Sequence, residues 1–147
     1  MSSTSKDTKD FFGRLVGTTG RAMKRRLDHN LVQAGSDLSA DYMMLLGFLS
    51  EHEGVNQQEV TDHMFRDKTA TTRWLDALEA RNLVARVPDK ADRRQKLIFL
   101  TKQGRQTVGE LVEIVHKTER EALQGIDSQN VKTCRKVLRL VRANLEG

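Results

Sequence analysis

The sequence contains one cysteine and one proline, and aromatic residues make up only 5% of it. A single cysteine, Cys134, cannot form an internal disulfide framework, which excludes the small disulfide-stabilised class of secreted proteins. The scarcity of proline and aromatics, with Leu, Val, Met and Ala supplying the apolar surface, favours a mainly α fold over a β-sandwich. No apolar run approaches the ~20 residues that a membrane-spanning helix needs.

The N-terminal segment is polar and lacks the apolar stretch of a signal peptide. We therefore expect a soluble, cytoplasmic protein with no membrane partner. Residues 1–7 are rich in Ser, Thr and Lys and are expected to be disordered. A chain of 147 residues is long enough to bury the core of one domain and to carry a dimerising extension.

Positive charge is concentrated in one segment of the chain. Between Arg66 and Arg105 there are 11 Lys or Arg against 5 Asp or Glu, a net charge of +6, whereas the whole chain carries +5. The remaining residues therefore have a net charge of −1. A basic segment of this kind is the electrostatic footprint of a surface that meets phosphates.

Apolar residues at spacings of three and four predict six helices. The first is expected to span residues 8–34, with Gly35 ending it. The other five are expected to begin at N-cap residues: Ser39, Asn56, Asp67, Thr101 and Asp127. Residues 83–87 and 95–100 have the composition of β-strands, and the polar residues 89–94 between them have that of a turn. This pattern predicts a β-hairpin.

The fourth helix and the hairpin together have the layout of a winged helix-turn-helix. Successive 100° steps put Lys68, Thr69, Thr72 and Asp76 on one outward face, with Arg73 beside it. Thr hydroxyls bond phosphates or base edges, and Arg can fork onto guanine. The candidate DNA contacts of this helix and its approach are Arg66, Lys68, Thr69, Thr71, Thr72, Arg73 and Asp76.

Two further groups of residues are candidate DNA contacts. Asn56, Gln57 and Gln58 open the third helix, where free N–H groups and the helix dipole favour a phosphate. Arg93 and Arg94 lie at the tip of the hairpin and suit a minor groove. Asp92 lies two residues before Arg94, and we expect its carboxylate to orient that arginine.

The sequence resembles the MarR family of bacterial transcriptional regulators. The resemblance rests on Gly54-Val55-Asn56-Gln57-Gln58-Glu59-Val60, on Asp67-Lys68-Thr69-Ala70-Thr71-Thr72-Arg73, and on the spacing from Asp92-Arg93-Arg94 to Leu100-Thr101-Lys102-Gln103-Gly104. The last pair matches the family's wing signature, an Asp-x-Arg followed at fixed distance by Leu-Thr-x-x-Gly. Asn82 occupies a position where the family usually has Gly. Arg66 lies just before the fourth helix, at a position where the family less often has an arginine.

The resemblance implies a homodimeric repressor that binds a pseudo-palindromic operator and is released by a small, often aromatic or phenolic, effector. It also implies that residues 8–37 and 102–147 form the dimerisation helices around a DNA-binding domain at residues 38–101. The sixth helix fits this division, because its apolar residues repeat at spacings of three and four, as in a coiled coil. This C-terminal seam consists of Val131, Cys134, Leu138, Val141 and Leu145.

Other functions remain open at this stage. A winged helix can bind an acidic protein instead of DNA, and Cys134 or the four histidines could make the regulator respond to oxidants or metal ions. A buried, inert thiol is the more common state of a cysteine on an apolar seam, and no two histidines share a short helical spacing. No nucleophile motif or glycine-rich phosphate loop is present, so we expect neither an enzyme nor a cofactor.

Overall fold

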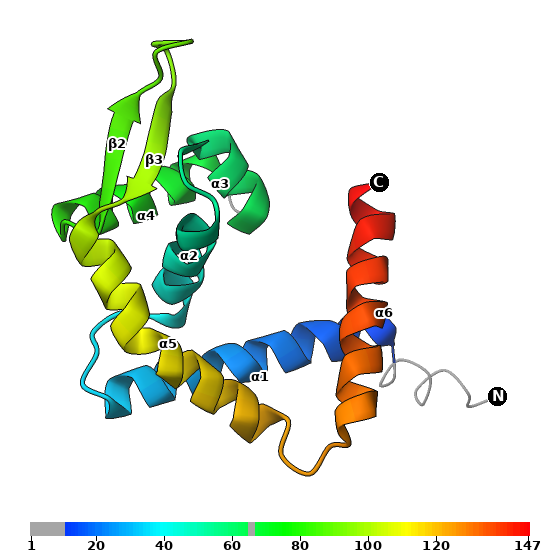
Figure 1. Cartoon of the computed structure of the whole chain (residues 1–147). Helices are drawn as coiled ribbons and strands as arrows, with labels where there is room; N and C mark the ends of the chain where they lie inside the picture. Colours follow the sequence, from blue (N-terminus) through cyan, green and yellow to red (C-terminus); the bar gives the residue numbers. More distant parts are fainter. Residues whose placement is uncertain (1–10, 65–66) are drawn as a thin grey trace.

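The computed structural model describes residues 11–64 and 67–147, so the expected disorder of residues 1–7 and the proposed contact by Arg66 lie outside the described residues. The predicted mainly α fold with a winged helix-turn-helix is confirmed (Figure 1). The elements in chain order are α1 (Phe12–Gln33), α2 (Ala40–Glu51), β1 (Val55–Asn56), α3 (Gln57–Met64), α4 (Lys68–Ala80), β2 (Val84–Pro88), β3 (Lys96–Leu100), α5 (Lys102–Ala122) and α6 (Ser128–Glu146).

The helices begin where the capping residues predict. The side chains of Ser39, Asp67, Thr101 and Asp127 each accept a hydrogen bond from a backbone N–H in the first turn of the following helix. The first helix was wrongly expected to run through residue 11. It begins at Phe12, since Phe11 has non-helical backbone angles (φ −59°, ψ 123°); the Phe11 side chain makes no capping hydrogen bond.

Helix ends also follow local chemistry. Gly35 has a φ of +80°, and the N–H groups of Gly35 and Ser36 donate to the carbonyls of Val32 and Leu31. This pair of bonds is a Schellman motif, which requires a left-handed residue at the glycine position. Asn82 ends α4 with a φ of 57°, so it takes the left-handed backbone shape that glycine adopts most readily.

The sheet has three antiparallel strands in the order β1-β3-β2. The hairpin strands each lie within one residue of their predicted bounds, and Arg86 pairs with Ile98 near their centre. The strand β1 was not predicted; it has two residues and pairs Val55 with Ile98. Two residues are too few to show the alternation that identifies a strand.

The core lies between α2, α3, α4 and the base of the sheet. Its largest fully buried side chains are Leu31, Leu45, Leu46, Leu49, Val60, Leu75, Leu78, Val84 and Ile98. At its margin the ring of Tyr42 meets that of Trp74 edge to face, with centroids 5.8 Å apart. These contacts hold α3 and α4 in a fixed orientation beneath the wing, which we define as β2, β3 and the turn between them.

The wing joins α5 at a tightly packed corner. The N–H of Thr101 donates to the carbonyl of Leu83, and the Thr101 hydroxyl donates to the carbonyl of Asn82 over 2.6 Å. A Cβ on Gly104 would lie 2.1 Å from the carbonyl oxygen of Leu83. The Leu-Thr-x-x-Gly motif therefore fixes the base of the wing against the first turn of α5.

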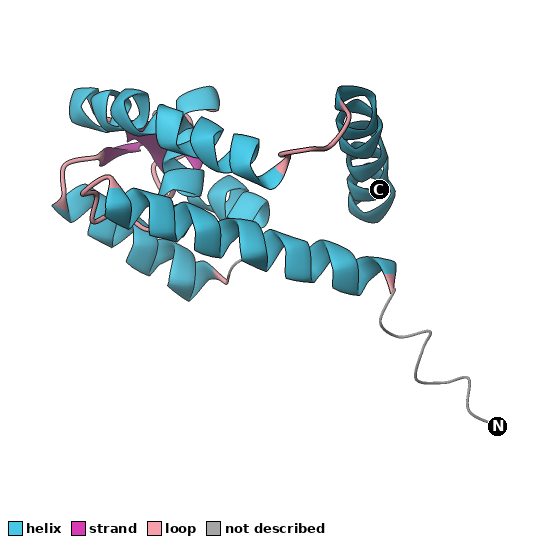
Figure 2. Ribbon diagram, turned by 90° about the horizontal axis from the view of Figure 1, so that it is seen from below, coloured by secondary structure: helices cyan, strands magenta, loops and turns pink. Residues whose placement is uncertain are grey.

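Outside the winged lobe, α1 lies alongside α5, and α6 lies to one side of both (Figure 2), where Arg135 of α6 bonds Glu119 of α5. In the buried half of α1, the Asn30 amide donates to Thr118 Oγ1 (2.9 Å) and Glu121 Oε2 (3.0 Å) of α5. In α5, Ile114 packs against the core while Val112 is exposed. No residue of α6 is buried in the single chain, and Cys134 is exposed, contrary to our expectation of a buried thiol.

Candidate nucleic-acid interface

The outward face of α4 is polar and open to solvent. Lys68, Thr69, Arg73 and Asp76 are exposed, as the helical wheel predicts, and Thr72 is half-buried. The Thr72 hydroxyl donates to the carbonyl of Lys68 over 2.9 Å and accepts from Gln57 Nε2 over 2.5 Å. A hydrogen bond thus joins Thr72, a candidate DNA contact on α4, to Gln57, a candidate DNA contact on α3.

Thr71 does not belong to this face. Its side chain is buried, and its hydroxyl is hydrogen-bonded to Thr61 Oγ1 of α3 and to the carbonyl of Asp67. The buried face of α4 is centred on Thr71, Leu75 and Leu78, and Trp74 and Ala77 beside it are only partly buried. The prediction of Thr71 as a DNA contact was therefore wrong, because its hydroxyl joins α3 to α4 inside the lobe.

The N-terminus of α3 carries a capping box. The Asn56 side chain accepts from the Glu59 N–H, and the Glu59 carboxylate accepts from the Asn56 N–H. Gln58 donates to Asp62 within the same helix. Asn56, Gln57 and Gln58 nevertheless lie together at the edge of one groove, which brings this group close to the recognition helix and the wing.

The tip of the wing is organised by two aspartates. Asp89 Oδ1 accepts from the N–H of Ala91, and Asp92 Oδ1 accepts from the N–H of Arg94, each two residues further along. Arg94 Nε lies 3.7 Å from Asp92 Oδ1, and its side chain is 95% exposed. Asp92 therefore shapes the turn and stays near the guanidinium of Arg94. Arg93 is also exposed at this tip.

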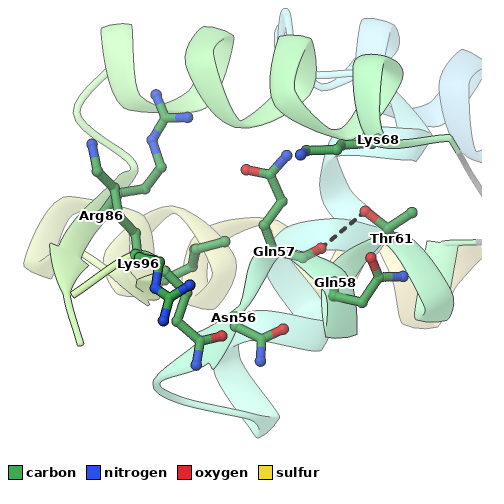
Figure 3. Close-up of a pocket in the computed structure, with 10 residues that line it drawn as sticks. Asn56, Gln57, Gln58, Thr61, Lys68, Arg86 and Lys96 are labelled. Atoms are coloured by element: carbon green, nitrogen blue, oxygen red, sulfur yellow. Dashed lines mark hydrogen bonds between the residues drawn. The ribbon is translucent and has the colours of Figure 1, made fainter. Parts of the chain in front are cut away.

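A groove of about 430 Å³ lies between the wing and the α3–α4 unit. Figure 3 shows Gln57 and Lys68 directed toward one another on one side, with Arg86 and Lys96 reaching it from the two wing strands. Its lining residues are Asn56, Gln57, Gln58, Thr61, Lys68, Arg86, Arg94, Gln95, Lys96 and Ile98. Four of these are Lys or Arg and none is acidic, so the groove favours an anion such as phosphate.

Sequence reasoning missed the role of Arg86 in this region. Arg86 Nε lies 3.1 Å from Glu79 Oε2, and Arg86 Nη2 lies 3.2 Å from Glu79 Oε1 and also bonds Asp76. The hydrogen bonds that Arg86 donates to Glu79 and Asp76 raise the pKa of Arg86, and the Arg86 guanidinium in turn lowers the pKa of Glu79. The one local signal was an arginine in the middle of an otherwise apolar strand.

A second hollow, of about 1320 Å³, lies between α1, α2, α3 and the end of α6. Its apolar lining includes Val16, Met44 and Met64, and its cationic side chains are Arg21, Lys24 and Arg142. Near it, the His63 ring stacks on Phe48 at 3.9 Å and the His52 ring stacks on Phe48 at 4.5 Å. Burial is the main cause that lowers the pKa of His63.

Within residues 11–64 and 67–147, no three His, Cys, Asp or Glu side chains lie close enough together to hold a metal ion. No helix in the same residues is long and apolar enough to cross a membrane.

Comparisons of the sequence with family models and with known proteins agree on one family. A model of the MarR family matches residues 36–95. YybA, an uncharacterized HTH-type transcriptional regulator of Bacillus subtilis, is 29% identical over 134 residues, which cover 90% of this chain and 87% of YybA.

Solved structures agree over most of the chain. A MarR-family transcriptional regulator from Rhodococcus sp. RHA1 superimposes with a TM-score of 0.81 and 29% identity, covering 96% of each chain. A mutant of Escherichia coli MarR, solved in complex with operator DNA, superimposes with a TM-score of 0.78 and 25% identity, covering 88% of this chain and 91% of that one.

Proposed function

The chain belongs to the MarR family, and from this premise we propose that it is a homodimeric, DNA-binding transcriptional regulator. The observation that carries the proposal is the groove between wing and recognition helix, which presents Lys68, Arg94 and Lys96 beside an exposed polar face of α4. Cationic side chains at a groove that joins two exposed elements suit the alternating phosphates and base edges of a duplex. The E. coli MarR complex with operator DNA supports the same interpretation.

The proposed contacts divide by element. On α4, Lys68, Thr69, Thr72 and Arg73 face the major groove, and Asp76 lies beside them. At the wing tip, Arg93 and Arg94 enter the adjacent minor groove, where the potential is most negative. Asn56, Gln57 and Gln58 meet the backbone, since they lie at the N-terminus of α3 and along the same groove.

We propose that residues 38–101 form the DNA-binding unit and that residues 8–37 and 102–147 form the dimerisation helices. Support comes from the apolar side chains that the single chain leaves exposed on α1 and α6, among them Leu15, Leu138 and Leu140. A two-fold dimer would set the two α4 helices in successive major grooves on one side of a pseudo-palindrome.

The expected mode of action is repression in the bacterial cytoplasm, relieved by a small effector. The hollow between α1, α2, α3 and α6 supports this part, because it joins the DNA-binding unit to the proposed dimerisation helices and combines apolar side chains with both cationic and acidic ones, the acidic ones being Asp41, Asp62 and Glu146. An aromatic or phenolic effector seated there would act by favouring a lobe spacing that does not fit DNA.

The deciding experiment is a fluorescence-anisotropy titration of the purified protein at two salt concentrations. The probe is the DNA upstream of its own gene, compared with a scrambled duplex of equal length. Selective binding that weakens steeply with salt is the expected result. If binding is equal on both probes and selection from a random DNA pool enriches no site, the basic groove serves another partner, such as an acidic protein.

A further inference from the structure

Arg86 makes a bridge between the wing and the recognition helix. Its guanidinium forks onto the Glu79 carboxylate through two hydrogen bonds of 3.1 and 3.2 Å, and the same Nη2 also bonds Asp76. Glu79 and Asp76 lie three residues apart on α4, whereas Arg86 lies on β2. A bidentate pair fixes orientation as well as distance, because two parallel bonds resist rotation.

The burial of β2 shows why this bridge matters for the wing. Val84 is buried at the base of the strand, Ala85 and Arg86 are partly buried, and Val87 and Pro88 are exposed. The Arg86 side chain is only 16% exposed. Arg86 is thus the last side chain of β2 that is held against the lobe before the tip. A two-stranded hairpin has little stability of its own beyond such an anchor.

The two partners of Arg86 are carboxylates, and without Arg86 their negative charge would be unpaired next to DNA. Asp76 lies on the outward face of α4, and Glu79 follows it by one turn. Two unpaired carboxylates at this position would repel phosphate. Three of the guanidinium's donor positions already serve these carboxylates, so Arg86 is poorly placed to be a principal phosphate ligand itself.

We propose that Arg86 is a positioning residue that locks the wing to the recognition helix, so that Arg94 and the α4 side chains meet one duplex at a fixed separation. This inference rests on the proposed DNA binding. Without the bridge, the hairpin pivots about its buried base at Val84. Arg94 then loses its register with the minor groove even though its own side chain is intact.

A double-mutant cycle tests this coupling. In the otherwise wild-type protein, Arg94→Ala should weaken operator binding about 10-fold. In the Arg86→Gln background, the same Arg94→Ala change should cost less than about 2-fold, because a displaced Arg94 already contributes little to binding. An equal loss in both backgrounds would mean that the two arginines act independently, and it would overturn the inference.

The matched control is Arg81→Gln. Arg81, which follows α4, pairs with Asp37 on the loop before α2, so the change removes another arginine–carboxylate pair, one that lies away from the wing. The loss from Arg94→Ala should remain about 10-fold in that background. A smaller loss there would show that any broken ion pair masks the wing contact.

Arg86→Lys separates geometry from charge. Lysine keeps the positive charge but cannot form a bidentate pair with a carboxylate. The loss of affinity caused by Arg94→Ala should therefore be as small in the Arg86→Lys background as in the Arg86→Gln background. Wild-type affinity in Arg86→Lys would show that charge suffices and would overturn the positioning role. Glu79→Gln breaks the fork without touching the groove's cations, and it replaces Arg86→Gln in the cycle if that variant does not fold.

The wild-type titration keeps failure of the proposed function distinct from failure of this inference. If the wild-type protein shows no selective DNA binding, the proposed function fails and the positioning role fails with it. If the wild-type protein binds selectively but Arg94→Ala has the same effect in every background, only the positioning role of Arg86 fails.

Discussion

At the scale of single residues, Gly104 has a steric requirement that Gly109 in the same helix does not share. A Cβ at position 104 would lie 2.1 Å from the carbonyl oxygen of Leu83, whereas a Cβ at position 109 meets nothing within 4 Å. Both glycines lie in α5, so intrinsic helix propensity is the same for each. The difference between their alanine variants therefore measures the packing at the base of the wing.

We predict that Gly104→Ala destabilises the protein by at least about 1–3 kcal/mol, the usual cost of overpacking a tight site. Gly109→Ala should be neutral or stabilise by up to about 1 kcal/mol, since alanine favours helix. Urea unfolding at one fixed protein concentration measures both. Equal stability of the two variants would show that the backbone between β2 and α5 can shift to accommodate a Cβ at position 104 at little cost.

His63 gives a prediction for pH. Its pKa is lowered from 6.5, first by burial and then by His52, with Arg142 acting in the same direction and Glu51 and Glu146 opposing. The folded state therefore binds this proton less readily than the unfolded chain does. Stability from this group is complete above the unfolded pKa near 6.5, and it is lost as pH falls toward the lower folded pKa.

The melting temperature of the wild-type protein should accordingly fall between pH 7.5 and pH 5.5, a window of roughly one unit either side of the histidine's ordinary pKa. His63→Gln should show a smaller fall, because glutamine cannot take up the proton. Thermal unfolding followed by circular dichroism supplies both curves. Parallel curves would assign the slope to other groups.

Thr71 and Arg86 mark the limit of residue-level prediction. Both lie at the boundary between two elements, and their roles are set by partners far along the chain: Thr61 for Thr71, and Asp76 and Glu79 for Arg86. A helical wheel orders the residues of one helix but does not give the direction in which neighbouring elements approach it. Exposed positions such as Thr69 and Arg73 were predictable because they face no neighbour.

At the scale of elements, the starts of helices were the most predictable feature. Ser39, Asp67, Thr101 and Asp127 cap through bonds within the first turn, so the sequence contains all the required partners. β1 was not predictable, because its two residues become a strand only by pairing with β3. Secondary structure formed by distant partners leaves little local signal.

The wing is the element whose DNA contact can be tested most directly. Arg94→Ala should weaken operator binding about 10-fold, reduce the salt slope by about one, and leave dimerisation intact. The matched control is Arg120→Ala, which removes the same charge from α5, where Arg120 pairs with Glu113. Fluorescence anisotropy across a salt series distinguishes the two. Equal effects of the variants would assign the change to net charge and remove the wing from the mechanism.

At the scale of the whole molecule, the single chain leaves a large apolar surface uncovered. The first half of α1 exposes Phe12, Leu15 and Val16, and α6 exposes Val137, Leu138 and Leu140. Contiguous apolar patches of this kind mark association surfaces in soluble proteins. Apolar periodicity in the sequence predicted both helices, but it could not tell which apolar residues pack against the core of their own chain. Leu27 and Leu31 of α1 are buried within the single chain, whereas Phe12, Leu15, Val16 and Met23 of the same helix are exposed.

The C-terminal seam on α6 provides the test of the dimer. Leu138 lies at its centre, and Leu138→Asp would place a carboxylate in the proposed interface, where desolvation without a partner is costly. The variant should therefore sediment as a monomer. It should also lose tight operator binding, because one lobe alone reaches only half of a pseudo-palindrome.

Thr133→Asp is the matched control, since it adds the same charge on α6 at an exposed position outside the seam. It should remain dimeric and bind DNA as the wild-type protein does. Analytical ultracentrifugation of both variants at the same concentration decides the question. A dimeric Leu138→Asp variant would move the interface off α6 and leave the exposed face of α1 as the remaining apolar surface for a partner.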